Sequence, residues 1–213
     1  MKELRKPLIL ILLILVIDQL IKIYVKTHFA IGDDVKVFGL DWFRIHFLEN
    51  KGMAFGMSFG NTIGKFLLTL IRVVLSVAIF IYMNKLIKRG EKKIIIYSFA
   101  LIFAGAVGNI IDCLLYGIIF NESTVFAAAT MFPAEGGYAP FLFGRVVDMF
   151  YFPLIDTTWP DWIPFVGGNN FRFFNAIFNF ADASITIGVV LLLVSYIWLS
   201  KSKKNNQEDI VVS

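Results

Sequence analysis

LILILLILVIDQLIKIYV, residues 8–25, is an apolar run of membrane-crossing length that contains the polar residues Asp18, Gln19 and Lys22. A helix needs about 20 predominantly apolar residues to cross the hydrocarbon core of a bilayer. Basic residues precede the run, as in a secretory signal peptide, but no small-residue cleavage site follows it. The run therefore predicts an uncleaved first membrane span.

Three further runs have the same character, at about residues 66–87, 94–119 and 176–199. The 213 residues are 58% hydrophobic and only 17% charged, which leaves too little polar material for the surface of a soluble protein. We predict an all-α integral membrane protein with four transmembrane helices. Residues 1–201 form a single membrane domain, and the polar residues 202–213 form a disordered tail.

Basic residues gather at three places and predict the orientation. They precede the first span, fill the short turn between the second and third, and follow the fourth: Lys2, Arg5, Lys6; Lys85, Lys88, Arg89, Lys92, Lys93; Lys201, Lys203, Lys204. With four spans, all three clusters fall on one side, which the positive-inside rule makes cytoplasmic. This placement also explains the net charge of +4 without a nucleic-acid partner.

Two long connections then lie outside. Within residues 30–60, Val35–Phe38 and Trp42–Leu48 are rich in β-branched and aromatic residues, and Gly39 between them fits a turn. These runs predict a small periplasmic β-sheet on the membrane surface. Residues 120–175 contain Trp159, Trp162 and many phenylalanines among prolines and glycines. That composition predicts an interfacial periplasmic segment at headgroup depth.

Four carboxylates are expected at similar depth near the outer face. Asp18, Asp112 and Asp182 lie in or at the predicted spans, and Asp148 stands among Val and Phe residues before the last span. A carboxylate inside a span is costly and marks a functional site by default. Convergence of four acids from distant parts of the chain predicts that the chemistry is located there.

Each acid also has a purely structural interpretation. Asp18 and Lys22, four residues apart on one helix, can neutralise each other. Asp112 follows Asn109, and Asp182 follows Asn179, at a spacing of three, so these side chains can join helices by hydrogen bonds. A structural role is favoured for the first two acids.

Asp148 and Asp182 have no Lys at helical spacing, and they are predicted to be functional. Two carboxylates at one partly dry site titrate as a unit, with one holding its proton. The charged member can take a proton from water while the protonated member polarises a carbonyl group. This is the chemistry of peptide-bond hydrolysis by aspartic proteases.

Other hydrolytic sites lack their residues in this sequence. There are two histidines, His28 and His46, and no His-Glu-x-x-His or Gly-x-Ser-x-Gly motif. Neither a metal nor a cofactor is predicted. The single cysteine, Cys113, is interpreted as a buried thiol.

Along its whole length the sequence resembles the lipoprotein signal peptidases (signal peptidase II) of bacteria. Five blocks are similar to the family's motifs and follow in the same order: Asp18–Gln19–Leu20–Ile21–Lys22; Asn50–Lys51–Gly52–Met53–Ala54–Phe55–Gly56; Ala104–Gly105–Ala106–Val107–Gly108–Asn109–Ile110–Ile111–Asp112; Val146–Val147–Asp148; Phe178–Asn179–Phe180–Ala181–Asp182.

The resemblance implies an aspartyl dyad, Asp148 and Asp182, in an intramembrane endopeptidase. Such an enzyme removes the signal peptide of a prolipoprotein on the N-terminal side of a cysteine that carries diacylglycerol. The other matching residues, Asn50, Gly52, Asn109, Asp112, Asn179, Asp18 and Lys22, would support the site or bind substrate. The resemblance also implies a bacterial cytoplasmic (inner) membrane, cytoplasmic termini, membrane phospholipid around a monomer, and inhibition by globomycin-type compounds.

The sequence departs from the family in two ways. Cys113 stands where the family usually has Arg, which removes the usual charge partner of Asp112, and Arg145 or Arg172 is a possible substitute. The stretches Tyr116–Gly144 and Tyr151–Phe171 are longer than the family leads us to expect. Two other classes remain open, a small proton-coupled transporter that uses the acids as a relay and a non-enzymatic assembly factor.

Overall fold

The structure is a computed structural model that describes residues 2–50 and 62–212. Four of its helices are long and apolar enough to cross a membrane, at Leu4–His28, Ile63–Lys88, Lys93–Ile119 and Phe180–Trp198. The four predicted spans are therefore confirmed, with ends that differ from the predictions by a few residues.

The first three spans correspond to α1 (Lys2–His28), α2 (Thr62–Lys88) and α3 (Lys93–Ile111). After α3 the backbone widens into a π-helical segment, η2 (Asp112–Tyr116), and ends in the short α4 (Gly117–Ile119). A π-helical turn inside a membrane helix is uncommon and is often found at functional sites. Here it begins at Asp112, one of the four predicted acids.

The last helix, α5 (Phe180–Val212), continues beyond the predicted end of the fourth span. The helix runs to Val212, through residues that the sequence predicts to be a disordered tail, and the division into a membrane domain and a tail stays a prediction. No proline or glycine interrupts residues 201–213, and Lys, Gln and Glu have good helix propensity. A helix already formed by an apolar run can therefore extend into this segment.

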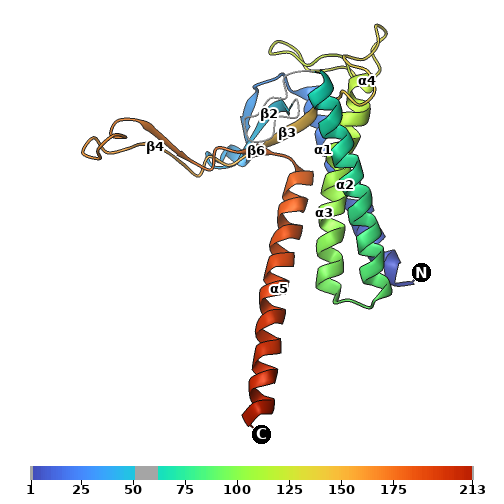
Figure 1. Ribbon diagram of the computed structural model, residues 1–213. Helices are drawn as coiled ribbons and strands as arrows, with labels where there is room; N and C mark the ends of the chain where they lie inside the picture. Colours follow the sequence, from blue (N-terminus) through green and yellow to red (C-terminus); the bar gives the residue numbers. More distant parts are fainter. Residues whose placement is uncertain (1, 51–61, 213) are drawn as a thin grey trace. The chain divides into compact units, whose positions relative to one another are not determined.

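The chain divides into two compact units, each described by itself. The helical unit contains residues 1–18, 67–110 and 180–213, which are the larger parts of α2 and α3, the first part of α1, and α5. Its core contains Ile11, Ile14, Met83, Ala100 and Ala104, all at most 6% exposed. Within the unit α2 and α3 are joined by a short turn (Figure 1).

Small residues on α3 let α5 approach closely. A Cβ added at Gly105 would lie 2.2 Å from the carbonyl oxygen of Ala181, the second residue of α5. Small residues at helix contacts are the usual device for close packing in membranes. The first turn of α5, which carries Asp182, is therefore held against the backbone of α3.

The sheet unit contains residues 19–66 and 111–179. Four antiparallel strands form its sheet in the order β1-β2-β3-β6: β1 (Asp34–Lys36), β2 (Arg44–Asn50), β3 (Val146–Tyr151) and β6 (Ile177–Phe178). A tight turn, η1 (Val37–Gly39), joins β1 to β2 and places Gly39 at φ 76°. The predicted small sheet and its turn are confirmed. The sheet is completed by β3, which lies in the segment predicted to be interfacial, and by β6, which lies at the predicted start of the fourth span.

The segment predicted to be interfacial also forms a second sheet, which has two strands. β4 (Ile155–Thr158) pairs with β5 (Asn170–Phe173), with Asp156 opposite Arg172, and the hairpin extends from the four-stranded sheet within its unit (Figure 1). Its loop exposes Trp162 and Phe165, which are 80% and 102% exposed. Exposed aromatic side chains suit an interfacial position, as the sequence predicts.

Candidate functional site

Asp148 lies in the middle of β3 and is 7% exposed. Its strand is central in the sheet, where Asp148 pairs with Leu48 of β2. The Nδ2 atom of Asn179 donates a hydrogen bond of 2.7 Å to its Oδ1 atom. Asn179 is fully buried, so this donor fixes the orientation of the carboxylate.

Asp182 lies in the first turn of α5. The Nδ2 atom of Asn109, on α3, donates a hydrogen bond of 2.7 Å to its Oδ1 atom. A carboxylate in the first turn also meets the unpaired N–H groups and the positive end of the helix dipole. Each of the two predicted catalytic acids is thus held by an asparagine.

Asp18 is fully buried and lies at the same helix terminus. Its Oδ1 atom accepts a hydrogen bond of 2.9 Å from the backbone N–H of Ala181. A Cβ at Gly108 would lie 2.8 Å from its Oδ2 atom, so glycine is needed there for the approach of α3. Asp18 therefore anchors the N-terminal turn of the helix that carries Asp182. The predicted pair of Asp18 with Lys22 stays a prediction, because the two residues fall in different units.

Asp112 has a cationic partner although Cys113 follows it. The Nζ atom of Lys22 is 2.8 Å from Asp112 Oδ2, and both side chains are fully buried. Gln19 Nε2 donates to Asp112 Oδ1 at 3.0 Å, and Tyr116 Oη donates to Gln19 Oε1 at 3.1 Å. The expectation that Cys113 deprives Asp112 of a charge partner was wrong, because α1 supplies that charge from 90 residues away in the chain.

Asp112 also contacts the strand that carries Asp148. The backbone N–H of Val147 donates to Asp112 Oδ2 at 3.2 Å. A Cβ at Gly144 would lie 2.0 Å from the carbonyl oxygen of Asp112, so this approach to β3 requires glycine. Asp112 therefore holds Val147 in place, and because Val147 directly precedes Asp148, Asp112 also helps to position Asp148.

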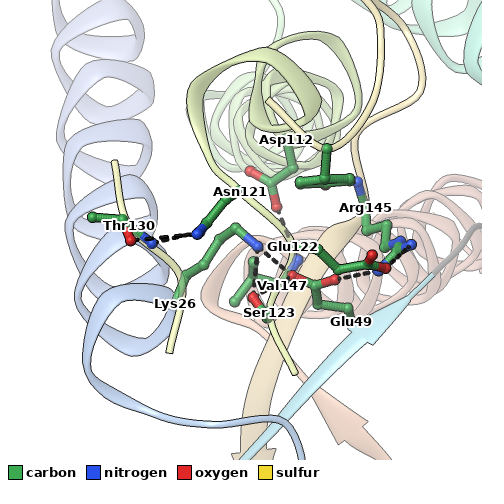
Figure 2. A network of polar contacts seen from close by, with 10 residues as sticks. Lys26, Glu49, Asp112, Asn121, Glu122, Ser123, Thr130, Arg145 and Val147 are labelled. Carbon is green, nitrogen blue, oxygen red and sulfur yellow. Dashed lines mark hydrogen bonds and ion pairs between the residues drawn. The ribbon is translucent and has the colours of Figure 1, made fainter. Parts of the chain in front are cut away.

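A buried ion network in the sheet unit was not predicted from the sequence (Figure 2). Lys26 Nζ contacts Glu49 Oε1 and donates to Ser123 Oγ at 2.9 Å, and the Lys26 side chain is fully buried. Arg145 Nη1 lies 3.1 Å from Glu49 Oε2, and its Nη2 lies 2.8 Å from Glu122 Oε1. The spacing of Lys22 and Lys26, four residues apart, is the sequence signal that could have indicated this network. A second lysine on one face of a membrane span needs an acidic partner.

This network holds the start of β3. Arg145 directly precedes the strand, and its N–H donates to Tyr138 Oη at 2.7 Å. Burial raises the pKa of Tyr138 above its ordinary range. Desolvation lowers the pKa of Arg145, but its hydrogen bonds to Glu122 and Glu49 outweigh this effect and raise the pKa overall. Arg145 is therefore a permanently charged link between β2 and β3.

One other predicted supporting residue, Asn50, lies in β2. Asn50 is the last residue of β2 and pairs with Val146, two residues before Asp148. Gly52 lies outside the described residues. Arg172, suggested as a partner of Asp112, lies on β5.

The structure groups the predicted site residues in two sets. Asp18, Asn109 and Asp182 lie in the helical unit, and Lys22, Asn50, Asp112, Asp148 and Asn179 lie in the sheet unit. The direct pairing of Asp148 with Asp182 stays a prediction. Within residues 2–50 and 62–212, no group of three or more His, Cys, Asp or Glu is arranged to hold a metal ion.

Comparison with known proteins assigns this chain to a family. The family described as Signal peptidase (SPase) II matches residues 10–198. A lipoprotein signal peptidase of Porphyromonas gingivalis (strain ATCC 33277) is 48% identical over 188 residues, covering 88% of this chain and 80% of the relative. A lipoprotein signal peptidase of Amoebophilus asiaticus (strain 5a2) is 35% identical over 186 residues, covering 86% and 74%.

The fold is also similar to that of solved structures. One, described as a bacterial membrane enzyme structure determined by the in meso method at 2.3 Å resolution, has a TM-score of 0.60 and 24% sequence identity. The similarity covers 93% of this chain and 91% of that chain. At this identity the likeness concerns the fold, and it agrees with a multi-pass membrane protein.

Proposed function

Because the chain belongs to the signal peptidase II family, we propose that it is an aspartyl endopeptidase that removes signal peptides from diacylglyceryl-modified prolipoproteins. Membership of the family makes it a membrane-embedded peptidase of lipoprotein processing. The proposal adds the catalytic residues, Asp148 and Asp182, and the position of the cut, on the N-terminal side of the lipid-modified cysteine.

The assignment of a catalytic role to the two acids rests on one observation. Asn179 donates to Asp148 and stands three residues before Asp182 in the chain, and Asp182 in turn accepts from Asn109. One short segment therefore supplies both the group that orients the first acid and the second acid itself. The structural interpretation of the remaining acids is supported in the same way, since Asp18 accepts from a helix N-terminus and Asp112 pairs with Lys22.

The proposed chemistry needs one charged and one protonated carboxyl group. The charged group takes a proton from water, and the oxygen of that water attacks the carbonyl carbon of the scissile peptide bond. The protonated group donates to the carbonyl oxygen as the tetrahedral intermediate forms. The C–N bond then breaks, the amine of the lipid-modified cysteine takes a proton, and a new carboxylate remains on the signal peptide.

We place the enzyme in a bacterial cytoplasmic (inner) membrane with both termini cytoplasmic and the site near the periplasmic face. The basic clusters beside the spans support this orientation. The proposed partners are lipid-modified prolipoproteins and membrane phospholipid. A monomer that needs no cofactor and is inhibited by globomycin-type compounds is part of the same proposal.

The function is tested by the products formed from two matched substrates. A synthetic prolipoprotein peptide with a diacylglyceryl cysteine and the same peptide with unmodified cysteine are incubated with the purified full-length protein, and mass spectrometry identifies the fragments. We expect cleavage of the modified peptide directly before its cysteine. Equal cleavage of both peptides, or a cut elsewhere, would contradict the proposed specificity.

A further inference from the structure

A buried acid lies on the face of the four-stranded sheet opposite to the face that carries Asp148. Glu49 is paired with Val147 in the register of β2 and β3, and the next pair is Leu48 with Asp148. Successive side chains of a strand point to opposite faces, so Glu49 and Val147 share one face and Leu48 and Asp148 share the other. All four residues belong to the sheet unit, and their arrangement does not involve the helical unit.

The face that carries Glu49 is apolar. Val147 and Met149 are fully buried in a hydrophobic cluster that also contains Phe47. The side chain of Glu49 is 2% exposed. A buried ionic group is costly, and apolar residues of similar volume are often at least as stabilising. Stability alone therefore gives no reason for an acid at this position, whereas a role in selecting one arrangement of the strands does.

The two carboxylate oxygens of Glu49 bind cations from two different parts of the chain (Figure 2). Its Oε1 atom contacts Lys26 Nζ, on α1, and accepts a hydrogen bond of 2.9 Å from Ser123 Oγ. Its Oε2 atom lies 3.1 Å from Nη1 of Arg145, which directly precedes β3. Glu49 thus links β2 to α1 through one oxygen and to the start of β3 through the other.

The register between β2 and β3 changes next to Asp148. Ile45 pairs with Phe150 and Leu48 pairs with Asp148, so β2 has one more residue than β3 between these two pairs. A bulge of this kind redirects the side chains beside it. A slip of one residue moves all side chains of a strand to the other face. The ion pairs of Glu49 lie at the end of the strands where the register determines the face to which Asp148 points.

A second lysine of α1 holds the same part of β3. Lys22, one helical turn before Lys26, pairs with Asp112 at 2.8 Å, and Asp112 Oδ2 accepts from the backbone N–H of Val147 at 3.2 Å. Val147 is the residue that Glu49 faces in the register. The two lysines therefore act on one short stretch of β3, one through its backbone and the other through its pairing with β2.

We propose that Glu49 and Arg145 are positioning residues for peptide cleavage, and that their ion pair fixes the register in which Asp148 points away from the hydrophobic cluster. The inference rests on the proposed catalytic role of Asp148. Glu49 acts through the strands and not on the substrate. Loss of the ion pair should lower kcat and leave KM unchanged, because protein in the slipped register binds the peptide but does not present the carboxylate to it.

The test measures kcat and KM of the purified full-length protein in detergent on a diacylglyceryl prolipoprotein peptide. Arg145→Gln removes the link to β3 and leaves Glu49 neutralised by Lys26, so no buried charge loses its only counterion. Glu122→Gln is the matched control, because it removes the exposed partner of the same guanidinium group. We expect Arg145→Gln to lower kcat on the order of tenfold with little change in KM, and Glu122→Gln to keep both parental values.

A second comparison separates positioning from stability. Glu49→Gln removes the charge that neutralises Lys26, whereas Lys26→Met/Glu49→Gln removes both buried charges and should recover thermal stability. The kcat of the double variant should stay on the order of tenfold below that of the parent, because the ion pair with Arg145 is still missing.

Three results would overturn the positioning role: a kcat that recovers with stability in the double variant, a parental kcat in Arg145→Gln, or a raised KM without a change in kcat, which would place these residues in substrate binding. A parent protein that does not cleave the peptide would give a different result, since it would remove the proposed function itself.

Discussion

Asn179 donates a 2.7 Å hydrogen bond to Asp148, and this contact joins a residue one position before α5 to the middle of β3. Both side chains are buried. The carboxylate therefore has a fixed orientation before any substrate binds. Positioning of this kind affects the chemical step more than substrate binding.

Asn179→Ala should lower kcat for prolipoprotein cleavage by up to about 10²-fold with little change in KM, because Asp148 loses its orienting donor. Asn169→Ala, in the exposed loop of the β4–β5 hairpin, is the matched control and should keep the parental kcat. A change in KM alone would show that Asn179 contacts substrate instead.

The Lys22–Asp112 ion pair should show strong energetic coupling, because both side chains are fully buried. Lys22→Met leaves a buried carboxylate without this cation, and breaking such a pair costs about 3–5 kcal/mol. The double variant Lys22→Met/Asp112→Asn should be less destabilised than the sum of the single variants. Thermal unfolding in detergent measures the cycle, and additive effects would contradict the pairing.

Glu49→Gln and Glu122→Gln make the same substitution on two partners of Arg145 that differ in burial. The Glu49 side chain is 2% exposed and also neutralises buried Lys26, so its loss should cost about 3–5 kcal/mol. The Glu122 side chain is 60% exposed, and its loss should cost about 0–1 kcal/mol. Equal costs would mean that the network contributes as a surface ion pair does.

Gly105→Ala tests the close approach of α3 and α5. In an unconstrained helix interior this change stabilises by roughly 1 kcal/mol. Here the new Cβ would lie 2.2 Å from the carbonyl oxygen of Ala181, and relief of such overpacking costs about 1–3 kcal/mol. A rise in thermal stability of the variant would show that the two helices are not in this contact.

Tyr138 should make stability fall at alkaline pH. Burial raises its pKa in the folded protein above the unfolded value of about 10, so the unfolded state loses its proton first. This contribution is fully present below about pH 10 and is lost as the pH rises through the folded pKa. Tyr138→Phe should therefore lose less stability than the parent between neutral pH and about pH 11, measured by denaturant unfolding.

Hydropathy predicts the four spans well, because they are long uniform runs, whereas the orientation that the basic clusters indicate stays a prediction. β3 was missed for a physical reason. Its residues Val146–Met149 are all buried, so they lack the alternation that identifies a half-exposed strand, and the surrounding aromatics suggest an interfacial loop.

The partners of the buried charged side chains could not be predicted from the sequence. The spacing of Asp18 and Lys22 suggests a local pair, whereas the Lys22–Asp112 contact joins residues that only the tertiary fold brings together. The same holds for Lys26 with Glu49. A short-range spacing rule shows which charges can meet on one helix, and it carries no information about contacts that depend on strand register.

Asp148 and Asp182 are proposed as the catalytic pair. The most direct test of their role is kcat of the purified Asp148→Asn and Asp182→Asn variants on a diacylglyceryl prolipoprotein peptide. Both should lose at least about 10²–10⁴-fold in kcat while remaining folded, and the parent should show a bell-shaped pH profile. Asp161→Asn, on the exposed hairpin, should retain full activity. Near-parental cleavage by either of the first two variants would remove that residue from the proposed catalytic pair.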